Sequence, residues 1–161
     1  MMREYGMRIL LWWFLFTALC IWIHSFIQGI DCFGPALLVL LHLKRIKEAA
    51  WLTPIWILIN EGAGSLAFGL SVLWIGGLVI LFYLLCQYLS SSNLLFLLTL
   101  SLLAGAWNSA VVTLMAALQE LHIPSEEIFL LGIKMAVLFP VLWSGILVAF
   151  QHWGRSEHVS P

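Results

Sequence analysis

The sequence predicts an all-α integral membrane protein with about six transmembrane helices. Of its 161 residues, 63% are hydrophobic and only 9% are charged. A soluble domain averages about 25% charged residues, so this chain has too few charges to cover a surface that faces water. The charges also fall between long apolar stretches. In lipid a backbone must satisfy its own hydrogen bonds, and we therefore expect each of these stretches to be a helix.

The apolar stretches follow one another without a linker, and we expect a single polytopic domain over residues 1–161. The predicted spans are approximately 7–28, 35–46, 49–61, 67–89, 94–118 and 128–150. The first is longer than the core of a signal peptide, so we expect it to be retained. The second is short for a bilayer, and it should be re-entrant, tilted or shielded by its neighbours.

The distribution of charge predicts the orientation of the chain. Six spans place both termini on one side, and that side carries six of the seven basic residues: Arg3, Arg8, Lys44, Arg45, Lys47 and Arg155. The other side carries acidic residues and no Lys or Arg. Because basic loops stay in the cytoplasm, we expect both termini to be cytoplasmic. A five-span alternative displaces as little as one charge, Arg155.

Two charged residues within the apolar part are candidates for a function. Glu61 lies in the segment Asn60–Ser65, which is either an outer loop with a solvated carboxylate or a broken helix whose carboxylate faces a cavity. Lys134 lies inside the sixth span, where a lysine is costly. It can snorkel to the outer interface, pair with Glu61 or Glu120, or serve transport.

The sequence contains no recognisable disulfide, metal-binding, catalytic or nucleic-acid-binding motif. The cysteines Cys20, Cys32 and Cys86 form no paired motif, and they are interpreted as small buried hydrophobes. His24 and His42 could ligate a haem only at matching depth, but they belong to opposite ends of the first two spans. No catalytic motif occurs, and no basic arm for nucleic acid. We therefore expect no enzymatic activity, no metal and no cofactor.

Tryptophans mark the expected membrane interfaces. Trp12, Trp13, Trp51 and Trp153 lie near predicted helix ends. Indole rings favour the headgroup region, so we expect these four side chains at the bilayer surface.

Four stretches of the chain follow the order of features in a known family. They are Phe33-Gly34-Pro35 with its apolar continuation, the segment Ile57–Leu70 around Glu61, Pro124 with Glu126 or Glu127, and Ala136–Leu142 around Pro140. In this order they resemble MreD, the rod-shape-determining membrane protein of bacterial cell elongation. The sequence departs from the family in having Glu61 where aspartate is usual, in the order Gly64-Ser65, and in Asn108 near the place of an acid in the fifth helix.

The resemblance implies a non-catalytic component of the inner membrane. Its partners would be an MreC-like periplasmic scaffold and, indirectly, the actin-like MreB and the peptidoglycan synthases. The family is related in fold to substrate-binding subunits of energy-coupling-factor transporters, so a small-solute-binding subunit is the alternative, and an anchor of a redox complex is a third. The candidate interaction or cavity residues are Glu61, Gly64, Gly69, Lys134 and Pro140.

Overall fold

The computed structural model describes residues 2–26, 31–63, 69–90 and 93–155. This part of the chain is helical and contains no strand. Its six helices are α1 (Met2–Phe26), α2 (Phe33–His42), α3 (Ile46–Ala63), α4 (Leu70–Tyr88), α5 (Leu94–Leu118) and α6 (Ser125–Arg155). The all-helical class predicted from the sequence is therefore confirmed for the described residues.

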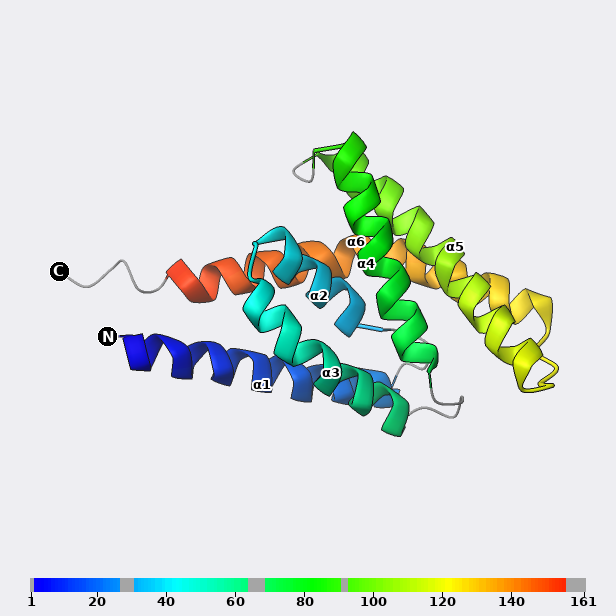
Figure 1. Cartoon of the computed structure of the whole chain (residues 1–161), viewed down its shortest axis with the longest axis horizontal. Helices are drawn as coiled ribbons and strands as arrows, with labels where there is room; N and C mark the ends of the chain where they lie inside the picture. Colours follow the sequence, from blue (N-terminus) through cyan, green and yellow to red (C-terminus); the bar gives the residue numbers. More distant parts are fainter. Residues whose placement is uncertain (1, 27–30, 64–68, 91–92, 156–161) are drawn as a thin grey trace.

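Successive helices reverse direction, so that the start of α1 and the end of α6 lie at the same end of the molecule (Figure 1). The short helix α2 lies in the middle, in contact with α3, α4 and α6. Helices α4, α5 and α6 pack in sequence, and the most extensive contact in the fold joins α5 to α6. This order leaves α1 at the edge, beside α3 (Figure 1).

Three of the described helices, α4, α5 and α6, are long and apolar enough to cross a membrane. A span needs about 20 apolar residues, and α2 and the apolar part of α1, Ile9–His24, fall short of that length. Many large apolar side chains on the longer helices are exposed, among them Ile80, Leu102 and Val137. Such faces are stable in lipid, so the structure supports a membrane-embedded protein.

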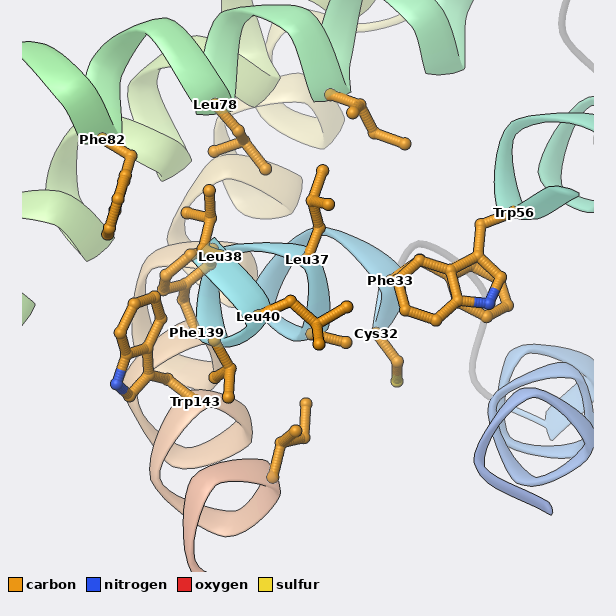
Figure 2. Packing of buried hydrophobic residues seen from close by; sticks show 14 of the residues in the cluster. Cys32, Phe33, Leu37, Leu38, Leu40, Trp56, Leu78, Phe82, Phe139 and Trp143 are labelled. Carbon is orange, nitrogen blue, oxygen red and sulfur yellow. The ribbon is translucent and has the colours of Figure 1, made fainter. Parts of the chain in front are cut away.

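The centre of the hydrophobic core is α2 itself. Every residue from Phe33 to Leu40 is buried, which leaves this helix no face toward the surroundings. Figure 2 shows its leucines against Leu78 and Phe82 of α4 and against Phe139 and Trp143 of α6, while Phe33 meets Trp56 of α3. The second helix is short, as predicted, and of the three alternatives for it the structure shows shielding by its neighbours. Burial on all sides explains how ten residues can remain helical inside an apolar environment.

Tryptophans attach α1 to the rest of the fold. The indole of Trp13 donates a hydrogen bond to the Glu48 carboxylate at 3.1 Å, and the indole of Trp56 donates to the Thr17 hydroxyl at 2.9 Å. Trp13 also stacks on Phe150 of α6. It is 1% exposed, so its ring packs between α1, α3 and α6 instead of facing the surroundings. Trp12 is half-buried for the same reason, against Phe150.

Glycines allow the closest helix contacts. A Cβ added to Gly105 of α5 would lie 2.5 Å from the Gly132 carbonyl oxygen of α6, and one added to Gly77 of α4 would overlap the Trp107 ring of α5. Helices in lipid associate through small residues of this kind because their backbones can then approach.

Several predicted boundaries need correction. The fifth span, 94–118, coincides with α5, but the second ends at His42 rather than 46, and residue 46 already begins α3. The third helix continues to Ala63, beyond the predicted end at 61. The fourth begins at Leu70 instead of 67, and the sixth is longer than 128–150 at both ends. The first begins at Met2 instead of 7, and its end predicted at 28 lies outside the described residues.

Candidate functional site

A half-buried carboxylate joins three helices where α2 begins. Asp31 accepts hydrogen bonds from the backbone N–H groups of Phe33, at 2.9 Å, and Gly34, at 3.0 Å. These are N–H groups of the first helical turn, which have no partner inside the helix. A carboxylate there also interacts favourably with the positive end of the helix dipole. Asp31 therefore stabilises the start of α2.

The same carboxylate binds side chains from two other helices. The indole N–H of Trp74 in α4 donates to its Oδ2 atom, and the amide of Asn60 in α3 approaches its Oδ1 atom at 3.4 Å. Trp74 is 4% exposed, so its indole N–H cannot donate to solvent water in place of Asp31. We call Asp31, Gly34, Asn60 and Trp74 the Asp31 node.

Gly34 is required by the geometry of this node. A Cβ at this position would lie 2.7 Å from Leu78 and 2.9 Å from the Asp31 carboxylate. Both distances are shorter than a van der Waals contact. The absence of a side chain thus lets α4 come close enough for Trp74 to reach Asp31.

Glu61 forms a second contact next to the node. It lies in the last turn of α3, and its Oε1 atom accepts a hydrogen bond from the backbone N–H of Gly69 at 2.8 Å. Gly69 has φ +106°, in the left-handed region that favours glycine, and it directly precedes α4. The carboxylate therefore links the end of α3 to the start of α4. Of the two sequence interpretations, the solvated loop is wrong, because Glu61 is helical and half-buried.

The second oxygen of Glu61 has a different environment. Its Oε2 atom is buried and has no hydrogen-bond partner among the described residues. An acceptor of this kind can accept a hydrogen bond from another molecule that reaches it. Sequence analysis missed the node beside it, although an acid two residues before Phe33-Gly34-Pro35 is typical of a helix start.

The remaining candidate residues do not join this site. Lys134 is exposed on α6 and makes no ion pair with Glu61 or Glu120 in the described part of the chain. Pro140 lies inside α6, half-buried beside Phe139 of the core. Gly64 lies outside the described residues. Of the four candidates that the structure describes, it brings together Glu61 and Gly69 alone.

The end of the molecule where α2 meets α3 is basic. Arg45 forms an ion pair with Glu48 at 2.8 Å, and its guanidinium lies 5.0 Å above the Phe150 ring. Lys44 and Lys47 flank it and are exposed. The acidic node and the basic turn lie at the two opposite ends of α2.

Two features bear on metal and cofactor binding. Among the described residues, no three His, Cys, Asp or Glu side chains are grouped as a metal site requires. His24 and His42 belong to the last turns of α1 and α2, helices that run in opposite directions (Figure 1). The two imidazoles therefore lie at opposite ends, as expected from the sequence, and cannot share one haem.

Comparison with known proteins identifies no relative. No family model, no curated protein and no solved structure matches this chain.

Proposed function

We propose that this protein is a non-catalytic, multi-pass component of the bacterial inner membrane that acts in the cell-elongation complex, where rod shape and peptidoglycan synthesis are controlled. It would cross the membrane six times with both termini in the cytoplasm. The proposal rests on the likeness to MreD in four stretches of sequence. It is consistent with the alternating helix directions and with the basic turn at the end of the molecule that holds both α1's start and α6's end.

One observation favours a structural role: the polar groups at the acidic end hold helices together. Asp31 binds donors from α2, α3 and α4, and Glu61 ties α3 to the start of α4. A site that captures a solute needs polar groups that are free to exchange partners. Here a fully buried helix is fixed by them, which gives the rigid framework that a scaffold for other proteins requires.

The partners would be an MreC-like periplasmic protein and, through it, the actin-like MreB and the wall synthases. Binding would use the exposed faces of the helices and the segment around Glu61. No nucleic acid partner is expected.

The test is depletion of the protein in its native host, followed by microscopy of cell shape. Rods should swell into spheres, with wall synthesis no longer confined to elongation, and a plasmid copy of the natural chain should restore them. Glu61→Gln should restore them as well, because its amide oxygen can still accept from Gly69. Depleted cells that keep their rod shape and growth rate would contradict the proposal.

A small-solute-binding transporter subunit is the second candidate, and one observation favours it. The buried Oε2 atom of Glu61 lacks a partner in the described part of the chain, and a bound solute could supply the missing donor. Native mass spectrometry of the purified protein would then detect a small molecule that Glu61→Gln loses. A scaffold would carry no such molecule in either form.

A further inference from the structure

The turn between α2 and α3 presents two lysines to the surroundings. Lys44 has φ 58°, the left-handed conformation that ends α2 sharply, and Lys47 follows in the first turn of α3. Both are exposed, and neither forms an ion pair within the described residues. Arg45 between them is already paired with Glu48 at 2.8 Å. Within the described part of the chain, two positive charges of this turn therefore have no counter-charge.

One face of α3 continues from Lys47 with apolar side chains. Trp51, Ile55 and Leu58 follow at intervals of four, four and three residues, a spacing that places them on one side of a helix. They are 38%, 42% and 63% exposed. The opposite side of α3 packs into the core through Ala49, Leu52 and Trp56. The exposed side is thus a stripe with a cation at one end, an aromatic ring below it and aliphatic side chains beyond. We call it the α3 stripe.

The α3 stripe has the length of one membrane leaflet. Lys47 and Leu58 are eleven residues apart, and a rise of about 1.5 Å per residue gives roughly 16 Å. This is about half of the ~30 Å hydrocarbon core. With Lys47 at the headgroup level, where Trp51 also fits as an interfacial indole, Leu58 reaches toward the bilayer midplane.

We propose that the α3 stripe and Lys44 bind one anionic phospholipid. The lysine ammonium groups would donate to the phosphate and to the anionic headgroup, and an acyl chain would lie along Trp51, Ile55 and Leu58. An acidic protein segment could match the charges alone, but the apolar continuation through one leaflet matches an amphiphile. The inference requires only that the chain is embedded in a membrane. It does not depend on the proposed role in cell elongation.

The test is native mass spectrometry of the full-length protein, released from detergent after incubation with equimolar phosphatidylglycerol and phosphatidylcholine. We expect the natural chain to retain phosphatidylglycerol in preference. Replacing Lys44 and Lys47 by Gln should lower the ratio of bound phosphatidylglycerol to phosphatidylcholine by about fivefold for each lysine, thus roughly 25-fold for both. Lys134→Gln is the matched control, since it removes an exposed lysine from α6, and should leave the ratio unchanged.

Two further variants separate charge from folding and from apolar contact. Replacing Lys44 and Lys47 by Arg keeps the charge and should keep the preference. Trp51→Ala should lower the binding of both lipids while leaving their ratio close to that of the natural chain. The proposal is overturned if the natural chain shows no preference, if the Gln variant keeps it, or if Lys134→Gln reduces it as much. Capture of an acidic protein without any lipid preference would also overturn it.

Discussion

Replacing Asp31 by Ala should destabilise the protein more than any other single polar deletion at this end. The change removes the acceptor of two backbone N–H groups at the start of α2, which costs about 0.5–2 kcal/mol for a helix cap. It also leaves the buried Trp74 indole without its charged acceptor, which adds about 1.5–3 kcal/mol. The Asn60 contact at 3.4 Å is long and adds little. The expected loss in the free energy of unfolding is therefore roughly 2–5 kcal/mol.

The assay is reversible unfolding of the full chain in mixed micelles of dodecyl maltoside and sodium dodecyl sulfate, followed by circular dichroism. Asp31→Asn is the intermediate variant, because its amide keeps one acceptor oxygen and replaces the other with an NH2 group that cannot accept from the N–H donors on that side. It should therefore cost less than Asp31→Ala but more than an ordinary surface change. Trp74→Phe removes the indole donor together with part of the ring volume, and the double-variant comparison cancels the effect of the lost volume. Asp31→Ala and Trp74→Phe combined should lower the free energy of unfolding by less than the sum of the two single losses. The difference should be about 1 kcal/mol or more, because both changes delete the same hydrogen bond. The reasoning is refuted if Asp31→Ala changes the free energy of unfolding by less than about 0.5 kcal/mol, the level of an ordinary surface change, or if the two losses add.

Two matched pairs of variants test the helix contacts in the same unfolding assay. Gly77→Ala should cost about 1–3 kcal/mol, because its Cβ is forced against the Trp107 ring. Gly76→Ala, whose Cβ meets open space, should be neutral or should stabilise α4 by up to about 1 kcal/mol through helix propensity. Equal effects of the two variants would show that α4 and α5 do not approach at Gly77. Gly69→Ala should cost about 1–2 kcal/mol because alanine resists the left-handed backbone. Glu61→Gln should lower the free energy of unfolding by less than about 1 kcal/mol, since a neutral acceptor remains for the Gly69 N–H. If Glu61→Gln costs more than Gly69→Ala, the hydrogen bond between Glu61 and Gly69 is not what connects α3 to α4.

The sequence predicts helices best where polar residues bracket them. The boundaries of α5 are correct because the serine-rich segment before it ends in Asn93, whose side chain caps the helix by accepting from the Leu95 N–H at 3.2 Å. The length of α2 predicted only that it could not cross a bilayer as an ordinary span. Its burial by α3, α4 and α6 required the structure.

The same reasoning failed where polar residues do not end a helix. Asn60, Glu61 and Gly62 suggest a loop by composition, yet α3 continues through them. In an apolar environment a backbone that leaves the helix loses its hydrogen bonds without gaining water. Instead, Asn60 and one oxygen of Glu61 bind distant partners, Asp31 and Gly69 respectively.

The Asp31 node could not be derived from local pattern. Its members come from positions 31, 34, 60 and 74, and only the packing of α3 and α4 around α2 brings them together. The acid before Phe33 indicates a cap, but nothing in the sequence pairs it with the Trp74 indole. Trp13 is a similar case, because its partner Glu48 is 35 residues away.

The two ends of α2 use charge in opposite ways. At its start, the Asp31 carboxylate is half-buried and bound by donors from the protein itself, so its charge stabilises the fold. At its end, Lys44 and Lys47 are exposed while Glu48 is taken up by Arg45 and Trp13. Substitutions at the acidic end should therefore change the stability of the protein, and substitutions at the basic end should change what surrounds it. The buried helix α2 makes this separation possible, because its apolar residues Phe33–Leu40 lie between the acidic and the basic end and expose no charged side chain.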